Sequence, residues 1–248
     1  MHRFYVPDFV FGRDLQLPSD EAEHLSRVLR LKTGDTITIF DGKGGEASAK
    51  IVSISGGTVT VRAGTPSQPP PEPKIVLTLA QALLKSDKMD DVLRDAAMLG
   101  VAAIQPFMSV RTDVPKAALR TGVRKQRWAR TVLSSVKQSG RAVVPPVYDV
   151  VDFRELLRRG GFKTRLMLVE PSAAASSPVP LTELRNLDSR PPSSTLIIVG
   201  PEGGWDPAEI ASAASAGITL VTMGRRTLRA DAAAAVVIPV VQYIYNDL

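Results

Sequence analysis

The chain has 248 residues, 44% of them hydrophobic, which suffices for one large folded domain or two smaller ones. It has no cysteine and two histidines, so disulfides, thiolate metal sites and a cysteine nucleophile are excluded, and a metal site or a serine–histidine–aspartate triad is not expected. No apolar run approaches the roughly 20 residues of a membrane span and no signal peptide is evident, so we expect a cytoplasmic protein without a membrane partner. The net charge of +6 points weakly to an anionic partner.

The first 65 residues predict a small β-rich domain with one helix. Ser19 can cap a helix over residues 20–31, with Leu25, Val28 and Leu29 on its inner side. Strands are expected at residues 35–40, 47–54 and 58–61, with a glycine-glycine hairpin between the last two. Residues 41–45, Asp-Gly-Lys-Gly-Gly, superficially resemble a phosphate-binding loop. Because they lack the Walker spacing and no helix follows, the pattern favours a plain β-turn.

Residues 66–73 contain five prolines in eight positions, which cannot continue a helix or a central strand. We therefore place a domain boundary there and expect one domain over residues 1–73 and another over residues 74–248.

Alternating strand and helix patterns in the second domain predict an α/β fold with a parallel sheet. Strands are expected at residues 75–79, 101–107, 166–169, 195–199 and 218–223. Ser86 can cap the first helix, which Gly100 ends, and Asp206-Pro207 is a favoured start for a later helix. Residues 171–194 are rich in serine, alanine and proline and predict a long mobile connection.

Residues 111–141 hold nine basic side chains against one acid, Asp113. At helical spacing one face carries Arg120, Arg124, Arg127, Thr131, Ser134, Gln138 and Arg141. The opposite face is apolar, with Trp128, Val132 and Val136. A solvated surface helix is the alternative, but the missing acids favour contact with a phosphate backbone through Arg111, Arg124, Arg127 and Arg141. Arg27 and Arg30 form a second, weaker basic cluster with Lys32, for which a solvated helix face is slightly favoured over RNA contact.

Two glycine-bearing segments, at residues 200–204 and 223–231, each follow a strand and precede a helix. In a parallel sheet both lie at the carboxyl edge, where open α/β sheets bind ligands. A tight turn without a ligand is the alternative for the Gly-Pro-Glu-Gly-Gly segment. It is not the dinucleotide fingerprint, and no acid follows to hold a ribose, so a nicotinamide enzyme is disfavoured.

The two segments together resemble the signature of the RsmE family, SPOUT-class methyltransferases that make N3-methyluridine in 16S ribosomal RNA. The resemblance covers nearly the whole chain. Its motifs are Gly-Pro-Glu-Gly-Gly at 200–204, Gly-Arg-Arg-Thr-Leu-Arg at 224–229, His-Leu-Ser-Arg-Val-Leu-Arg at 24–30, Lys-Ser-Asp-Lys-Met at 85–89, Leu-Gly-Val at 99–101 and Gln-Ser-Gly-Arg at 138–141.

This resemblance implies a PUA-like RNA-binding domain, a catalytic α/β domain with a deep trefoil knot, a homodimer, and S-adenosylmethionine as the cofactor. It further implies a C-terminal helix bent at Pro239, although the β-branched residues 236–245 by themselves equally suit a strand. The cofactor-binding residues that it implies are Val199, Gly200, Glu202, Gly203, Met223, Gly224, Thr227 and Leu228, with Glu170 and Pro171 as weaker candidates.

The chain departs from the family pattern at several positions. Met98 and Lys137 stand where the family usually has glutamate, and the usual Leu-Arg-Thr-Glu-Thr-Ala is here Leu-Arg-Ala-Asp-Ala-Ala at residues 228–233. Arg229 is kept, but the acid is shortened to Asp231.

The function that follows is methyl transfer from S-adenosylmethionine to N3 of a uridine in the 16S RNA of the small ribosomal subunit. Arg229 is expected to stabilise the charge that develops on the base, and Asp231 to orient Arg229 or to accept the proton. Two alternatives stay open: a non-catalytic RNA-binding or ribosome-assembly protein on the same fold, and a methyltransferase of this class for another RNA.

Overall fold

The computed structural model describes residues 2–114, 122–172, 178–187 and 193–247. The chain divides into two compact units. Unit 1 is Met1–Glu72 with Leu133–Val144, and unit 2 is Pro73–Val132 with Pro145–Leu248. One cut near residue 73 does not describe this division, because Leu133–Val144 belongs to unit 1. Within the described ranges no helix has the length and hydropathy needed to cross a membrane.

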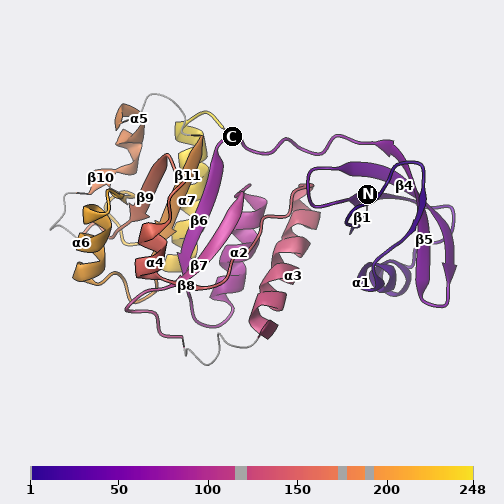
Figure 1. The fold of residues 1–248 in the computed structure, drawn as a ribbon, viewed down its shortest axis with the longest axis horizontal. Helices are drawn as coiled ribbons and strands as arrows, with labels where there is room; N and C mark the ends of the chain where they lie inside the picture. The colour runs from indigo at the N-terminus through magenta and orange to yellow at the C-terminus, as the bar shows by residue number, and fades with distance from the viewer. Residues whose placement is uncertain (1, 115–121, 173–177, 188–192, 248) are drawn as a thin grey trace. The chain divides into compact units, whose positions relative to one another are not determined.

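The sheet of unit 1 is drawn in indigo and purple in Figure 1. It has five strands in the order β1-β3-β4-β5-β2. The elements of unit 1 are β1 (Arg3–Tyr5), β2 (Asp14–Gln16), α1 (Ser19–Glu23), η1 (His24–Val28), β3 (Thr36–Phe40), β4 (Glu46–Ser55) and β5 (Thr58–Pro66). The predicted hairpin joins β4 to β5, and Gly56 and Gly57 both have positive φ angles, of 57° and 82°. Such angles at both turn positions match the twist of paired strands, so glycine fits both places.

The predicted helix over residues 20–31 is shorter than expected and starts differently. Pro18, not Ser19, precedes the first turn, and its carbonyl accepts the first helical hydrogen bond from Ala22, at 2.8 Å. After Glu23 the helix widens into a π-helical turn, in which the Leu29 amide donates to the His24 carbonyl at 3.0 Å. The helix stops where Arg30 takes a φ of 54°.

The glycine-rich loop at residues 41–45 is a turn, as expected. One carboxylate oxygen of Asp41 accepts hydrogen bonds from the amides of Lys43, at 2.7 Å, and Gly45, at 2.9 Å. These are the amides that a bound phosphate would need. The Gly44 amide donates to the Ala142 carbonyl at 3.1 Å, so three amides of the loop are already engaged.

Unit 2 contains a seven-stranded, wholly parallel sheet of order β10-β12-β9-β11-β6-β7-β8. Its elements in chain order are β6 (Val76–Ala82), α2 (Lys88–Met98), β7 (Ala103–Met108), α3 (Gly122–Ser139, which continues into unit 1), β8 (Val151–Asp152), α4 (Phe153–Arg158), β9 (Thr164–Leu168), β10 (Val179–Pro180), η4 (Leu181–Glu183), α5 (Leu184–Leu187), β11 (Ser194–Val199), α6 (Pro207–Ser215), β12 (Thr219–Thr222) and α7 (Ala230–Ile244). The predicted α/β class and the five predicted strands are confirmed.

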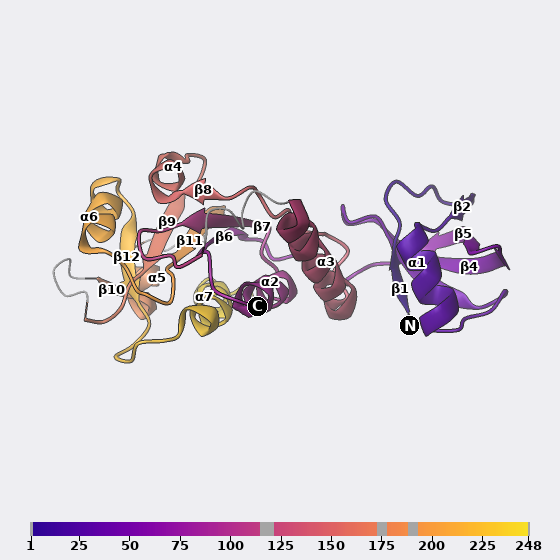
Figure 2. The ribbon, with the colours of Figure 1, turned by 90° about the horizontal axis from the view of Figure 1, so that it is seen from below.

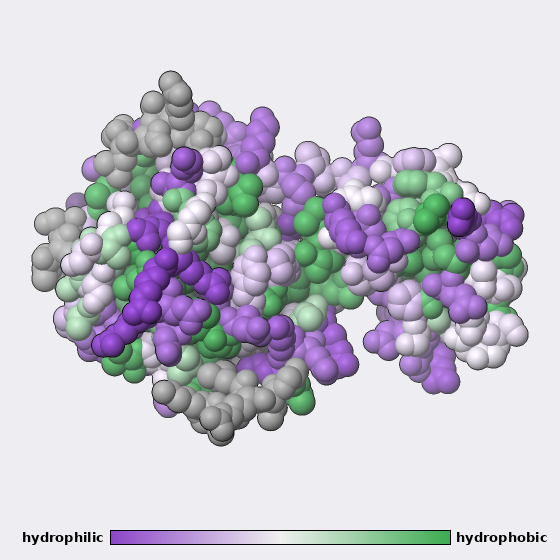
Figure 3. Space-filling view, in the orientation of Figure 1, coloured by the Kyte–Doolittle hydropathy of each residue, from purple (hydrophilic) through white to green (hydrophobic). Residues whose placement is uncertain are grey.

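Helices cover both faces of this sheet. Seen edge-on in Figure 2, α4 and α6 lie on one face, and α2 and α7 lie on the other. On the α4 side, Phe107, Phe153 and Trp205 pack together, with the rings of Phe107 and Trp205 stacked 6.1 Å apart. Each such ring contributes roughly 1.5–3 kcal/mol by burial. The outer side of α4 is charged, and Figure 3 shows hydrophilic side chains gathered over it.

Three further expectations for unit 2 need correction or completion. Ser86 does not cap α2, because it takes a φ of 53° and Asp87 occupies the cap position. Residues 171–194 are not simply a mobile connection: within the described part, β10 pairs with β12 and a helical turn follows, while residues 173–177 and 188–192 lie outside the description. The C-terminal segment is helical, and α7 accommodates Pro239.

Candidate active site

A cavity of about 350 Å³ lies at the carboxyl ends of β9, β11 and β12. This is the edge at which parallel α/β sheets bind ligands, and the volume falls within the usual range for small-molecule sites. Both glycine-bearing segments reach it, as expected. The predicted site residues that line it are Glu170, Pro171, Val199, Gly200, Glu202, Met223, Thr227, Leu228, Arg229 and Asp231. Gly203 and Gly224 were also predicted for the cofactor site but do not line the cavity.

The loop at residues 200–206 is held against the sheet by close packing. A Cβ atom on Gly200 would lie 2.8 Å from the Trp205 ring, and one on Gly204 would lie 2.8 Å from a carboxylate oxygen of Glu170. The Trp205 indole donates a hydrogen bond of 2.7 Å to the Leu168 carbonyl at the end of β9. Gly204 also has a φ of 69°, a backbone conformation that favours glycine, and a Cβ there would displace the Glu170 carboxylate.

Gly203 lies against the segment that follows β7, and its predicted cofactor contact stays a prediction. Its added Cβ would lie 3.1 Å from the backbone oxygen of Arg111, in the segment that follows β7. The Arg111 guanidinium donates to the Gly203 carbonyl at 3.4 Å and lies 3.7 Å from the Asp206 carboxylate. Gly203 therefore permits the segment after β7 to approach the loop.

The start of α6 fixes the same segment. Asp206 and Glu209 form a reciprocal capping box, as the Asp-Pro start and an acid three residues later permit. The buried Glu209 carboxylate also accepts hydrogen bonds from the Ser109 hydroxyl and the Val110 amide, both at 3.0 Å. One side chain thus caps a helix and anchors the segment that carries Arg111.

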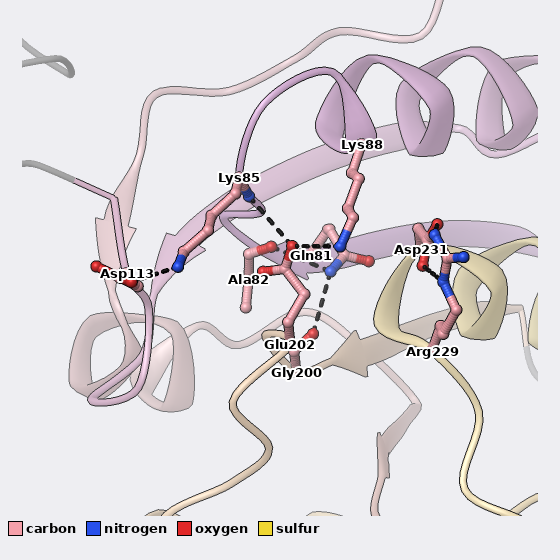
Figure 4. Close-up of polar contacts among 9 residues, drawn as sticks. All are labelled: Gln81, Ala82, Lys85, Lys88, Asp113, Gly200, Glu202, Arg229 and Asp231. Atoms are coloured by element: carbon pink, nitrogen blue, oxygen red, sulfur yellow. Dashed lines mark hydrogen bonds and ion pairs between the residues drawn. The ribbon is translucent and has the colours of Figure 1, made fainter.

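Lys88, at the first turn of α2, forms one wall of the cavity. Its ammonium donates to a carboxylate oxygen of Glu202 at 3.0 Å, and the Lys85 amide reaches the same oxygen at 3.4 Å (Figure 4). Lys85 itself pairs with Asp113, and this hydrogen bond raises the pKa of the Lys85 ammonium. The start of α2 therefore holds the loop that follows β11.

Arg229 and Asp231 form a two-pronged ion pair beside Lys88 and Glu202 (Figure 4). The Arg229 Nε and Nη2 atoms lie 3.0 and 2.6 Å from the two Asp231 carboxylate oxygens. Arg229 is 73% exposed, whereas Asp231 is 17% exposed. The hydrogen bond from Arg229 lowers the pKa of Asp231 and raises that of Arg229, so both groups are charged at neutral pH. A carboxylate with a lowered pKa is a weak proton acceptor, which favours an orienting role for Asp231.

Other cavity residues were not predicted for the site, although Lys88 and Arg226 lie in motifs that carry the family resemblance. They include Lys88, Leu168, Val169, Trp205, Arg226 and Ala233. The sequence signals were present but ambiguous: Leu168 and Val169 read as core residues of a strand, and Arg226 as one of several arginines.

The predicted RNA-binding arginines have different environments. Arg27 is exposed and pairs with Glu23 at 2.7 Å, one helical turn away, while Arg30 is exposed just after the helix. Arg124 lies over the Trp128 ring at 5.9 Å, and Arg127 pairs with Asp87 and Asp90. Lys116 and Arg120 lie outside the described residues. The apolar face of α3 is confirmed, because Trp128, Val132 and Val136 are buried.

The prediction that Arg141 lies on the exposed stripe is wrong. α3 ends at Ser139, and Arg141 is 6% exposed and pairs with Glu72 at 2.5 Å within unit 1. The helical spacing of the sequence pattern continues to residue 141, whereas the helix itself ends at Ser139. Nearby, the unusual Lys137 pairs with the buried Glu21 at 2.7 Å, so its charge is matched.

Two family models match this chain. Residues 70–242 match a family model described as an RNA methyltransferase domain, and residues 17–63 match one described as an RNA methyltransferase PUA domain. The fold and site therefore define an RNA methyltransferase of the SPOUT class with a PUA-like domain.

The chain belongs to the family of ribosomal RNA small subunit methyltransferase E, as its motifs predicted. It is 31% identical to that protein of Synechocystis sp., over 93% of this chain and 73% of the relative. It is 30% identical to that of Mycobacterium bovis, over 94% and 88%. The crystal structure of the Neisseria gonorrhoeae protein bound to S-adenosylmethionine is 33% identical, with a TM-score of 0.86 over 99% of this chain and 98% of that one.

Proposed function

We propose that this protein transfers a methyl group from S-adenosylmethionine to N3 of a uridine in the 16S RNA of the small ribosomal subunit. The observation that carries the proposal is the Arg229–Asp231 pair, fixed beside a cavity to which both glycine-bearing loops contribute. The relatives' names identify ribosomal RNA of the small subunit as their substrate.

The cavity suits the cofactor. Its walls combine apolar side chains, including Val169, Val199 and Leu228, with the backbone of Gly200. The Glu170 carboxylate adds a negative group that suits a cationic ligand. When bound, S-adenosylmethionine supplies an electrophilic methyl group. The loops after β9, β11 and β12 would hold it, with Glu202, Met223 and Thr227 among their contacts.

Arg229 acts on the base. As the N3 proton of the uridine passes to solvent water, negative charge spreads onto the two flanking carbonyl oxygens, and the Arg229 guanidinium stabilises that charge until N3 takes the methyl group. Asp231 holds the guanidinium in place through two hydrogen bonds, and the carboxylate stays ionised because its pKa is lowered. The protein's further contribution is to align the base with the methyl group.

RNA is held by cations of both units, the exposed Arg27, Arg30 and Arg111 and the half-buried Arg124, and the target base is flipped out of its helix. Arg127 joins them only if the RNA competes with Asp87 and Asp90. We place the protein in the cytoplasm, where ribosomal subunits assemble.

We also propose that the chain of unit 2 follows a knotted path and that the protein forms a homodimer through α7. The inner side of α7 packs on α2, but Val236 and Tyr243, on its outer side, are 42% and 72% exposed. The helix contains no lysine or arginine and one acid, Asp231. A helix that is apolar all round is normally buried, so this face suits a second copy of the chain.

The decisive experiment uses purified protein, labelled S-adenosylmethionine and small subunits that lack the modification. We expect label in 16S RNA at N3 of one uridine, mapped by mass spectrometry. Arg229→Ala should reduce the rate at least a hundredfold, the typical effect of losing one stabilising donor, while cofactor affinity is kept. Turnover at the wild-type rate would remove Arg229 from the mechanism.

Two other outcomes identify the competing functions. Binding to subunits without any label in the RNA would show a non-catalytic assembly protein, which the alanines at 230 and 232 would then explain. Label in a different RNA would keep the chemistry and change the substrate.

A further inference from the structure

Three cations line the cavity, and two of them are already paired. Lys88 pairs with Glu202 at 3.0 Å, and Arg229 pairs with Asp231 at 2.6 Å. The third, Arg226, is exposed and forms no hydrogen bond or ion pair with any residue in the described parts of the chain. Arg226 is therefore the cavity cation that can bind an anion without breaking an existing pair.

We propose that Arg226 binds the phosphate of the nucleotide that is methylated. The inference rests on the proposed function and deepens it. Arg226 stands three residues before Arg229 in the loop between β12 and α7, so at most about 10 Å of extended backbone separates them. A uridine whose base faces Arg229 has its own phosphate one ribose away. The planar guanidinium can donate two parallel hydrogen bonds to that phosphate.

The carboxylate of the cofactor offers the same anionic chemistry as a phosphate. Two observations favour the phosphate. Arg226 is exposed to solvent, from which RNA must approach. Arg225 beside it is also exposed and has no partner among the described residues, so the loop carries two adjacent unmatched charges. A chain of phosphates brings one negative charge for each of the two arginines, whereas the cofactor has a single carboxylate.

The experiment compares wild-type protein with Arg226→Gln and Arg226→Lys. Arg185→Gln is the matched control, because Arg185 is also exposed, lies on α5 and does not line the cavity. The dissociation constant for unmodified small subunits is measured over a range of salt concentrations. Calorimetry then gives the affinity for S-adenosylmethionine and for 5′-methylthioadenosine, which lacks the amino-acid carboxylate.

We expect Arg226→Gln to weaken subunit binding about ten- to a hundredfold, as for the loss of a charged hydrogen bond. The slope of log affinity against log salt should fall by about one contact, while both cofactor affinities stay unchanged. Lysine should restore the salt slope but only part of the affinity, because it lacks the planar fork. Arg185→Gln should match the wild type.

Two results would overturn the inference. Unchanged subunit affinity and salt slope in Arg226→Gln would show that no phosphate is bound there. A loss of affinity for S-adenosylmethionine but not for 5′-methylthioadenosine would assign the arginine to the cofactor carboxylate. Both measurements are equilibrium binding, so they decide the point even if the wild type transfers no methyl group, which is the separate failure of the proposed function.

Discussion

At the cavity, the exposed guanidinium of Arg229 is oriented by the less exposed carboxylate of Asp231. Arg229 alone would sample many rotamers, but its two hydrogen bonds to Asp231 fix the fork in one orientation. The family motif has glutamate where this chain has Asp231. The shorter acid still reaches Arg229, because the two residues are separated by one position at the start of α7.

We expect Asp231→Asn to lower kcat about ten- to a hundredfold, because one oriented charge partner is lost. Since the pKa of Asp231 is lowered from its ordinary value near 3.8, the carboxylate is ionised well below neutral pH. It would protonate only as the pH falls below that value. The wild-type rate should therefore show no decrease between pH 8 and pH 5 that comes from protonation of Asp231. An acid limb near neutrality that disappears in Asp231→Asn would instead identify Asp231 as the base.

At the scale of elements, the loop between β11 and α6 is shaped by glycine. Gly204 combines a φ of 69° with a close approach to Glu170, whereas Gly217 has a φ of 74° but no atom nearer than 3.9 Å to an added Cβ. Both positions thus have a backbone conformation that strains a residue with a side chain. Only at Gly204 would the added Cβ also meet a close neighbour.

We expect Gly204→Ala and Gly217→Ala each to lower the free energy of unfolding by about 1–2 kcal/mol through backbone strain. Only Gly204→Ala should also weaken S-adenosylmethionine binding, because it displaces the Glu170 carboxylate from the cavity wall. Chemical denaturation and calorimetry measure the two effects. Equal cofactor affinity in both variants would show that the Glu170 contact is irrelevant to the site.

The sequence predicted those elements whose local signals agree. Buried strands such as β11, the Gly56-Gly57 hairpin and the Asp206 cap have unambiguous patterns, and each forms as expected. Two-residue strands such as β8 and β10 exist only through their neighbours in the sheet, so no local periodicity marks them. The same limit applies to Arg141, whose burial depends on Glu72, far away in the sequence.

The same contrast between local sequence signals and contacts of distant residues holds for the candidate site. Both glycine-bearing loops could be placed at one sheet edge because each follows a predicted strand and precedes a predicted helix. The wall that Lys88 forms could not be predicted, because Lys88 meets the cavity only through the packing of α2. The sequence likewise could not show which arginines form ion pairs. Arg127 pairs with Asp87, whereas Arg226 has no partner among the described residues.

For the whole molecule, the oligomeric state can be tested directly. We expect wild-type protein to sediment as a dimer and Tyr243→Lys to shift it toward the monomer, because a charge would be buried in an apolar interface. Val52→Lys, at a valine of β4 that is 38% exposed, is the control for an added surface charge. A monomeric wild type at micromolar concentration would contradict a dimer built on α7.

The cavity joins parts of the chain that are distant in sequence, and this has a consequence for how the protein acquires its site. The Gln81 side chain donates to the Gly200 carbonyl across 119 positions; Gln81 lies in β6, and Gly200 directly follows β11, the parallel strand beside it. Such non-local pairings form slowly, because the entropy cost of closing a long loop comes before any stabilising contact is made. The ligand site therefore arises late in folding, together with the sheet. A cofactor that binds only the finished site would slow unfolding without hastening folding.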